Sequence, residues 1–367
     1  MNRLRRSLYA RNVASTSGLL IGVLAIVAVV GALSAGTGSS LTLIIPNFFI
    51  TVIIVIALQM FTGNSGVVSW GHSAFVGIGA YVTAWLTVPS VIKSDVFRTM
   101  PSWLLNAEWS FIPTIIVATL AGTLAAALIG IVLCRMKETA MAMSTLALLV
   151  IAHGVYANWF GMTRGAQGVY GLPQNTTLWG AFGFACLAVI VGVTFRDSRV
   201  GLRLQASRED PLAAEATGVS VVRARYIAWV ASAALAALCG SVWAQFNLAF
   251  DPSQFYYTQV FAVLSMLVIG GMATMSGAII GAGVVTVLSQ ILYNIEGGSL
   301  FGIDVPRISG LQQMILAIVT LLILIYRRNG ILSWWELDEW VRKGKKRLFP
   351  GSRPPGARPV GDDKEGG

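Results

Sequence analysis

The chain has long apolar stretches that contain no lysine, arginine, aspartate or glutamate, although its 367 residues include 26 basic and 16 acidic ones. Only 11% of the sequence is charged and 55% is hydrophobic, whereas about a quarter of the residues of a soluble domain are charged. This distribution excludes an ordinary soluble protein and predicts several membrane spans. It also argues against an ion-coupled carrier, because proton and sodium coupling usually depends on buried charges.

Residues and motifs typical of catalysis are equally scarce. Cys134, Cys186 and Cys239 lie in or beside apolar stretches without paired spacing, so they predict neither a disulfide framework nor a metal site. The motifs GxxxxGK[ST], GxSxG and HExxH do not occur, so any ATP that is used must be hydrolysed by another chain. His72 and His153 are the only histidines, and the sequence places neither for metal binding or acid–base catalysis. We therefore expect no catalytic residue, metal or cofactor on this chain.

About ten apolar stretches are candidates for crossing roughly 30 Å of hydrocarbon as helices. The longer ones cover residues 18–36, 41–62, 111–133, 139–158, 177–195, 226–246 and 309–326, and the shorter or glycine-interrupted ones cover 72–88, 257–274 and 278–295. Their continuous pattern favours helices over a β-barrel, which would alternate with period two. The predicted fold class is all-α: a polytopic membrane bundle of about ten transmembrane helices, with a broken or glycine-rich helix near 63–72.

Basic residues are distributed unequally between the connections on the two sides of the predicted membrane. One side would receive only Lys93, Arg98, Arg164 and Arg307, and all other lysines and arginines fall on the opposite side. Because basic residues accumulate in cytoplasmic connections, both termini are predicted to be cytoplasmic. Basic residues beside membrane spans contact anionic lipid, so no nucleic-acid partner is expected despite the net charge of +10.

This topology divides the chain into three parts. Residues 1–17 would be a basic cytoplasmic N-terminus, residues 18–326 the transmembrane domain, and residues 327–367 a cytoplasmic tail. The tail should be disordered after about residue 350, because glycine, proline and charged residues leave little apolar surface to bury.

The most unusual stretch is FTGNSGVVSWGHSAFVGIGAY, from Phe61 to Tyr81. It should break the helix and free backbone groups, which at membrane depth must be satisfied by protein or by a water-filled cavity. One interpretation is the lining of a translocation path for a polar or zwitterionic solute, with a new helix near His72 directing its N-terminus toward an anionic group. The other is a tight turn whose glycines serve packing. The candidate path residues are Gly63, Asn64, Ser65, Gly66, Ser69, His72 and Ser73.

The loop 196–225 should contain a short capped helix. Asp210 as N-cap, Pro211 at the first helical position and Gly218 beyond the end predict a helix over about 211–217. Its small-residue face suits insertion into a groove of a cytoplasmic partner, and a helix lying on the membrane surface is the alternative. The candidate contact residues are Arg208, Glu209, Asp210, Ala213, Ala214, Glu215 and Gly218, with Ala216 on the same face.

Several separate segments resemble the permease subunits of branched-chain amino acid ABC transporters, which take up leucine, isoleucine and valine. The resemblance covers roughly residues 41–331. It is carried by TGNSGVVSWGHSAFVGIGAY (62–81), STLALLVI (144–151), NWFGMTRGAQGVYGLP (158–173), GLRLQASREDPLAAEATGV (201–219), FDPSQF (250–255), MLVIGGMATMSGAIIGA (266–282) and RRNGIL (327–332).

The resemblance implies a multi-pass permease domain over 18–326 in the bacterial inner membrane. Its implied partners are a second homologous permease, two cytoplasmic ATP-binding subunits that hold ATP and Mg, a periplasmic solute-binding protein and the amino-acid substrate. The loop 196–225 would carry the coupling helix that docks on an ATPase. The segment 63–73 would line the path, and the outer loops 89–110 and 161–176 would meet the loaded binding protein. The chain itself would be a transport subunit and not an enzyme.

One departure from the family pattern bears on the substrate. Where the family tends to have a GGxGSxxGP turn, residues 270–278 read GGMATMSGA. Related permeases for urea, amides or aromatic acids share the remaining pattern, so they stay open as alternatives. An ion-coupled secondary carrier and a membrane enzyme or scaffold are the alternatives from other classes.

Overall fold

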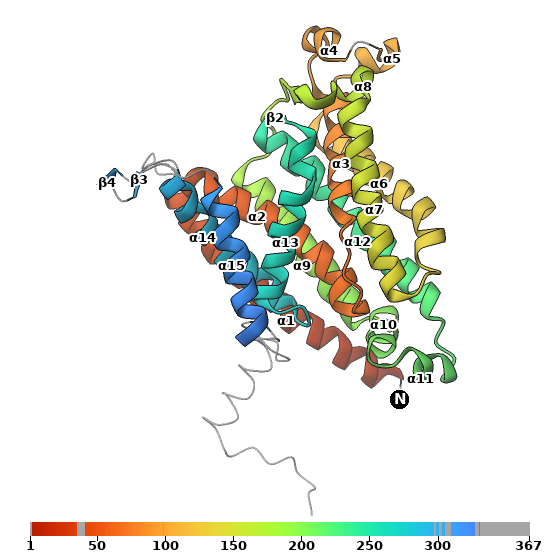
Figure 1. Cartoon of the computed structure of the whole chain (residues 1–367). Coiled ribbons are helices and arrows are strands. Elements are labelled where there is room, and N and C mark those ends of the chain that lie inside the picture. The colour runs from red at the N-terminus through yellow and green to blue at the C-terminus, as the bar shows by residue number, and fades with distance from the viewer. Residues whose placement is uncertain are drawn as a thin grey trace, which may run out of the picture.

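The computed structural model describes residues 2–34, 41–97, 99–296, 299–300, 303–304, 310–326 and 330. These residues form a helical bundle in which the chain runs repeatedly between two ends (Figure 1). Within the described residues, eight helical segments are long and apolar enough to cross a membrane. The remaining two of the predicted stretches form α3 and α15, which are each 16 residues long. The predicted all-α membrane bundle is therefore confirmed.

The helices that run between the two ends are listed here in chain order. They are α1 (Asn2–Ser34), α2 (Leu41–Leu58) continued by the π-helix η1 (Gln59–Gly63), α3 (His72–Thr87), α6 (Phe111–Leu133), α7 (Glu138–Asn158), α9 (Leu178–Asp197), α12 (Val221–Asn247), α13 (Tyr257–Gly270), α14 (Met275–Glu296) and α15 (Leu311–Tyr326). The predicted stretch 257–274 is too long, because Gly271 turns the chain at a φ of 117° and α13 ends at Gly270.

The two ends of the bundle differ in their short elements. The end that we call the outer end carries α4 (Ser90–Val96), α5 (Ser102–Leu105), α8 (Phe160–Thr163), η2 (Gly165–Gln167), β1 (Val169–Tyr170), β2 (Ala249–Phe250) and η3 (Pro252–Phe255), and β3 (Ser299–Leu300) and β4 (Ile303–Asp304) follow α14 there. The opposite, inner end carries α10 (Arg199–Glu209) and α11 (Pro211–Ala216), and the start of α1 lies there too (Figure 1).

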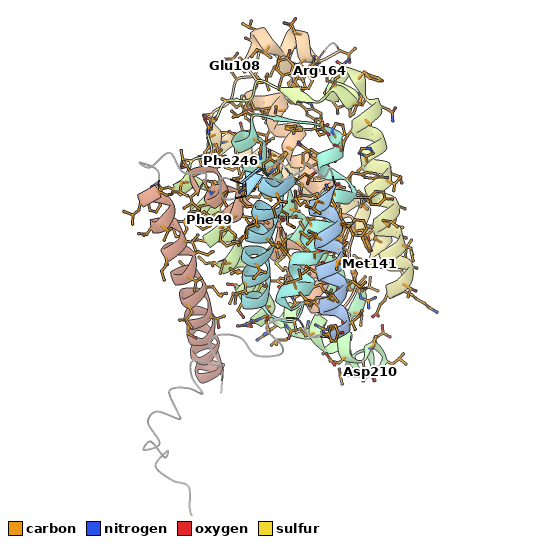
Figure 2. All side chains as sticks on the ribbon, turned by 60° about the vertical axis from the view of Figure 1, so that its left-hand side comes forward. Phe49, Glu108, Met141, Arg164, Asp210 and Phe246 are labelled. Atoms are coloured by element: carbon orange, nitrogen blue, oxygen red, sulfur yellow. The ribbon has the colours of Figure 1, made fainter. Side chains whose placement is uncertain are left out.

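Charged side chains mark both ends. Glu108 and Arg164 lie at the outer end and Asp210 lies at the inner end, with the apolar bundle between them (Figure 2). At the inner end Arg225, at the start of α12, forms an ion pair with Glu138 at the start of α7. That the inner end faces the cytoplasm remains a prediction from the basic residues. The helix α1 begins at Asn2, so it includes residues 2–17 of the predicted N-terminal segment, whereas most of the predicted tail 327–367 lies outside the described residues.

Close backbone contact between α3 and α12 organises the centre of the bundle, and these two helices make its most extensive contact. A Cβ atom on Gly79 would lie 2.0 Å from the carbonyl oxygen of Ala237, and one on Gly240 would lie 1.9 Å from that of Val76. Only glycine leaves room for this approach, which is the usual way membrane helices pack tightly. The hydroxyl group of Thr83 donates a 2.6 Å hydrogen bond to Ser241 across the same contact.

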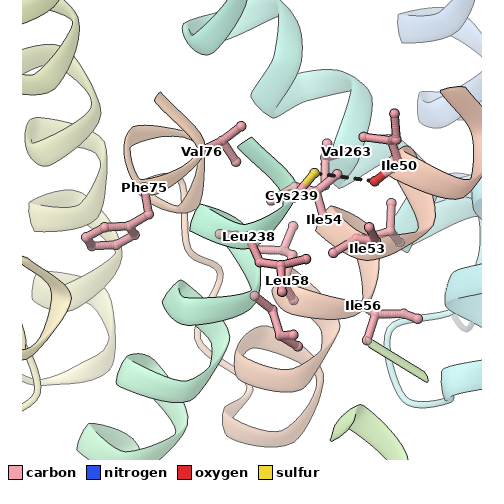
Figure 3. Close-up of a cluster of buried hydrophobic side chains, with 14 of the residues drawn as sticks. Ile50, Ile53, Ile54, Ile56, Leu58, Phe75, Val76, Leu238, Cys239 and Val263 are labelled. Carbon is pink, nitrogen blue, oxygen red and sulfur yellow. Dashed lines mark hydrogen bonds between the residues drawn. The ribbon is translucent and has the colours of Figure 1, made fainter. Parts of the chain in front are cut away.

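The apolar core lies where α2 packs against α12 and its neighbours. Ile50, Ile53 and Ile54 of α2 are buried beside Leu238 of α12 and Val263 of α13 (Figure 3). The thiol of Cys239 donates to the carbonyl oxygen of Ile50 at 3.3 Å, which satisfies the only polar group of that side chain. These buried contacts join α2 to α12 and α13.

The outer end is held together by side chains that satisfy backbone groups. Lys93 of α4 is fully buried and donates from Nζ to the carbonyl oxygens of Leu104, at 3.2 Å, and Ala107. Burial lowers the pKa of Lys93 to about 8, and the nearby Glu108 carboxylate opposes that shift. Glu108 in turn accepts a 2.6 Å hydrogen bond from the backbone N–H of Ser90. The predicted outer loop 89–110 is thus a compact cap with its own small helices.

Lys93→Met should loosen this cap and leave the bundle intact. The substitution removes the only cation that the structure shows bonded to these two carbonyl oxygens, and each unsatisfied buried group costs about 1–3 kcal/mol. We expect faster hydrogen exchange or proteolysis over residues 90–107, with unchanged exchange in α3 and α12. Ser94→Ala, at an exposed serine of the same helix, is the matched control and should leave the cap protected. Wild-type protection in Lys93→Met would show that the lysine does not hold the cap.

Candidate functional site

The predicted helix break is present, and its backbone groups are satisfied by neighbouring side chains. The π-helix η1 ends α2, the chain leaves helical structure after Ser65, and α3 begins at His72. Asn64 Nδ2 donates 2.8 Å to the carbonyl oxygen of Met60, and the backbone N–H of Trp70 donates 3.2 Å to Thr145 Oγ1. A π-helical turn inside a longer helix is uncommon and frequently marks a functional position.

The histidine at the start of α3 is satisfied within the protein. Its Nδ1 lies 2.8 Å from Ser69 Oγ and its Nε2 lies 2.9 Å from Ser232 Oγ. The His72 ring also packs edge-on against Trp229 and Phe75 and is buried. The contacts with Ser232 and Trp229 attach the end of the break to α12. His153 is also engaged, since it stacks on Tyr256 at 4.0 Å and lies 3.3 Å from the carbonyl oxygen of Pro252.

The break contacts α10, a helix that the sequence analysis left as loop. Arg208 Nη1 donates a 2.6 Å hydrogen bond to the carbonyl oxygen of Gly63, and Gln205 Nε2 donates a 2.8 Å hydrogen bond to Asn64 Oδ1. Gly66 has a φ of 76°, and a Cβ there would lie 2.9 Å from Cγ of Arg208. The glycine therefore both turns the chain and leaves room for the arginine. The signal for α10 was Ser198, whose side chain caps this helix by accepting from Gly201 N.

The predicted helix after Asp210 is confirmed as α11. Asp210 Oδ1 accepts from the backbone N–H groups of Leu212, at 2.9 Å, and Ala213, at 3.0 Å. Pro211 stands at the first position, and Gly218, with a φ of 83°, follows the end of the helix. Leu212 is 79% exposed at the tip of this helix.

The faces of α11 differ in exposure, and Ala214, which the sequence analysis included among the candidate contact residues, is not available for contact. Ala213 and Ala216 are exposed, as are Glu209 and Glu215 at its edges, whereas Ala214 is buried against the rest of the chain. The exposed residues form a small apolar knob with charged edges, and no other part of the described chain covers it.

A cleft of about 420 Å³, lined by both polar and apolar side chains, opens between helices of the bundle. Its walls come from α2, α12, η3, α13, α14 and α15, and one residue, Val76, comes from α3. The lining residues are Ile44, Asn47, Ile50, Thr51, Ile54, Val76, Cys239, Trp243, Gln254, Thr258, Gln259, Ala262, Met266, Thr286, Ser289, Gln290, Tyr293 and Gln312. None of these lining residues is charged, and amide and hydroxyl groups alternate with aliphatic ones.

The cleft occupies the outer half of the bundle. On α2 it extends from Ile44 to Ile54, and on α13 from Thr258 to Met266, which are in each case the turns nearest the outer end. Beyond its deepest residues, toward the inner end, lie η1 and the α13–α14 turn. There a Cβ on Gly63 would lie 2.4 Å from the carbonyl oxygen of Met272, so the two segments touch.

Sequence analysis missed the cleft, although a signal was present. Thr286, Ser289, Gln290 and Tyr293 follow one another at spacings of three, one and three residues, which places them on one face of α14. Asn47 on α2 and Gln259 on α13 are polar residues within apolar stretches, and both also line the cleft. A stripe of neutral polar residues within a membrane helix indicates a buried or solvated face.

The predicted path residues and the cleft are neighbours but do not coincide. Gly63, Asn64, Ser65, Gly66, Ser69, His72 and Ser73 lie between the inner half of the bundle and α10, and all except the exposed Gly66 are buried. None of them lines the cleft. Whether they contact the solute remains a prediction, whereas their contact with the predicted coupling segment through Arg208 is observed.

The comparison with known protein families gives the class of this bundle. Residues 40–325 match the family described as branched-chain amino acid transport system / permease component. The match covers most of the chain and includes the break, the cleft and the α10–α11 segment. The chain therefore belongs to this family of transport permeases, and the resemblance carried by the sequence segments is confirmed.

Individual relatives agree with this assignment. The chain is 23% identical over 332 residues to the high-affinity branched-chain amino acid transport system permease protein LivM of Salmonella typhimurium strain LT2, covering 81% of this chain and 71% of the relative. It is 23% identical over 320 residues to LivM of Escherichia coli K12, covering 77% and 68%. A probable branched-chain amino acid transport permease protein LivH of Methanocaldococcus jannaschii is 28% identical over 159 residues, covering 42% and 48%. No solved structure matches the chain significantly.

Proposed function

We propose that this chain is a membrane subunit of an ABC importer that moves branched-chain or related amino acids inward, driven by ATP hydrolysis on partner subunits. The observation that carries the proposal is an uncharged cleft, lined by both polar and apolar side chains, in a bundle that belongs to the permease family. The chain would act as a transport subunit and not as an enzyme, in the inner membrane of a bacterium.

The chemistry of the cleft suits an aliphatic amino acid. Amide and hydroxyl groups, such as those of Gln259, Gln290 and Thr286, donate to a carboxylate and accept from an ammonium group. Because these groups carry no net charge, they bind the zwitterion less tightly than a charged side chain would. Ile54, Ala262 and Met266 line the deeper part and accommodate an apolar side chain. A path must bind weakly enough to release what enters it.

A second permease subunit would cover the open side of the cleft. Polar side chains at membrane depth do not face lipid, because hydrocarbon leaves their hydrogen-bonding groups unsatisfied. The described residues leave the cleft open on one side, and we expect protein to complete its wall. We assign that wall to the second permease, which would complete the path between the two subunits.

The remaining partners fit the two ends. The knob formed by Leu212, Ala213 and Ala216 would dock on one of two cytoplasmic ATP-binding subunits, which supply ATP and Mg. The outer cap over residues 89–110 and the 161–176 segment would receive the loaded solute-binding protein. Lipid surrounds the apolar faces, and nucleic acid has no part in this function.

Uptake into proteoliposomes tests the proposed function. The chain should be assembled with its partner permease, both ATPases and the binding protein, and supplied with ATP and labelled leucine. We expect accumulation against a gradient that stops when any ATPase is omitted. Uphill accumulation by this chain alone would contradict the proposal.

A charge placed in the cleft should block flux. Gln290→Glu introduces a carboxylate into the cleft, and an unpaired ionised group costs about 2.5–3.5 kcal/mol at the centre of a membrane helix. The carboxylate would repel the solute carboxylate or hold its ammonium group, so we expect uptake to fall at least about tenfold, since 1.4 kcal/mol corresponds to one decade. Gln313→Glu, at an exposed glutamine outside the cleft, is the matched control. Equal uptake by both variants would remove Gln290 from the path.

A further inference from the structure

The contact between α10 and the broken helix spans two segments that the sequence keeps far apart. Arg208 crosses above Gly66 and binds the carbonyl oxygen of Gly63, the last residue of η1, at 2.6 Å. Gln205 stands three residues earlier on the same face of α10 and binds Asn64 Oδ1 at 2.8 Å. A guanidinium bond to a carbonyl oxygen is charge-assisted and directional, so it fixes the position of Gly63 relative to α10.

The other side of the break faces the path. The backbone of Gly63 touches Met272 in the α13–α14 turn, inward of the cleft residues Ile54 and Met266. Gln59, in the first position of η1, is fully buried, and its Oε1 and Nε2 have no hydrogen-bond partner among the described residues. A buried amide without partners raises the free energy of this arrangement. An arrangement of η1 in which the Gln59 amide finds hydrogen-bond partners would lower this free energy, so the contact between Gly63 and Met272 is not held by Gln59.

We propose that Arg208 and Gln205 are positioning residues that hold η1 against Met272 and thereby close the inner end of the path. The inference rests on the proposed function and deepens it. Movement of α11 on its ATPase is passed to α10 through Asp210, which begins α11 directly after α10 ends. Arg208 and Gln205 then pull the end of α2, which separates Gly63 from Met272 and frees the Gln59 amide for the passing solute. The break thus acts as the gate of the cleft, and movement of α10 opens it.

Arg208→Ala in the complete transporter tests the proposal. Uptake per ATP hydrolysed should fall at least about tenfold, while the ATPases remain bound and continue to hydrolyse ATP. Arg203→Ala is the matched control, because Arg203 lies on the same helix but is exposed. It should keep the wild-type ratio. Arg208→Lys, which retains one donor without the guanidinium fork, should recover part of the ratio.

A double-mutant cycle tests the second contact. Gln205→Ala and Asn64→Ala should each lower uptake per ATP. The double variant should lose less than the sum of the two single losses, because the bond that the two side chains share is removed in both. Independent, additive losses would show that the two side chains do not act through each other.

The outcomes separate this inference from the proposed function. Wild-type transporter that neither binds the ATPases nor accumulates solute would refute the function. Wild-type transporter that couples normally, together with an Arg208→Ala variant that keeps its uptake per ATP, would overturn the gate. Loss of folded permease in Arg208→Ala, Arg208→Lys and Gln205→Ala, measured by size-exclusion chromatography, would assign these residues to fold stability alone and would also overturn it.

Discussion

Gly240→Ala should strongly destabilise the folded protein. The added Cβ would lie 1.9 Å from the carbonyl oxygen of Val76, and a backbone atom within α3 does not move independently of its helix. The two helices must therefore separate along the most extensive contact of the bundle. Overpacking of this kind costs about 3 kcal/mol. Thermal unfolding in detergent, followed by chromatography, should show a large decrease in the midpoint.

Gly183→Ala is the matched control for this substitution. Gly183 lies within α9, and a Cβ there would meet nothing within 4 Å. Alanine costs less backbone entropy than glycine in a helix, by about 0.5–1 kcal/mol, so the control should unfold at the wild-type temperature or slightly above it. Equal unfolding temperatures for Gly240→Ala and Gly183→Ala would show that α3 and α12 do not approach each other as closely as the structure shows.

Ala213→Arg should abolish uptake without unfolding the permease. Ala213 is exposed on α11, so arginine there meets no part of the described chain that it must displace. A bulky charge on a small apolar knob would be incompatible with a groove that fits alanine, and an uncompensated charge buried at such a contact costs about 3–5 kcal/mol. We expect uptake to fall by about a hundredfold or more and the ATPase subunits to be lost on purification.

Two further variants define the extent of this surface. Ala216→Arg, at the other exposed alanine of α11, should behave like Ala213→Arg. Leu202→Arg, at an exposed leucine of α10 outside the knob, should retain the ATPases. Normal ATPase association and uptake in both alanine variants would remove the coupling assignment from α11.

Local sequence was enough to predict the elements whose causes are local. Uninterrupted apolar stretches predicted the spanning helices, because burial in lipid depends on length and composition. Asp210, Pro211 and Gly218 predicted α11, because capping groups act on backbone atoms within a few residues. The break near Gly63 and the new helix at His72 were predicted from glycine and polar residues that no continuous membrane helix favours.

Tertiary structure decided which of these elements meet. Gln205 and Asn64 are 141 residues apart in the sequence, and nothing near either residue specifies the other. The cleft likewise takes its lining from several helices, so its polar residues appear in sequence as isolated exceptions within apolar stretches. Composition and spacing therefore determined that the chain crosses the membrane, where it breaks and which loop is exposed. Helix packing depends on side-chain shape across distant segments. Only packing decided that the exposed loop contacts the break through α10, and that the break lies on the inner side of the cleft.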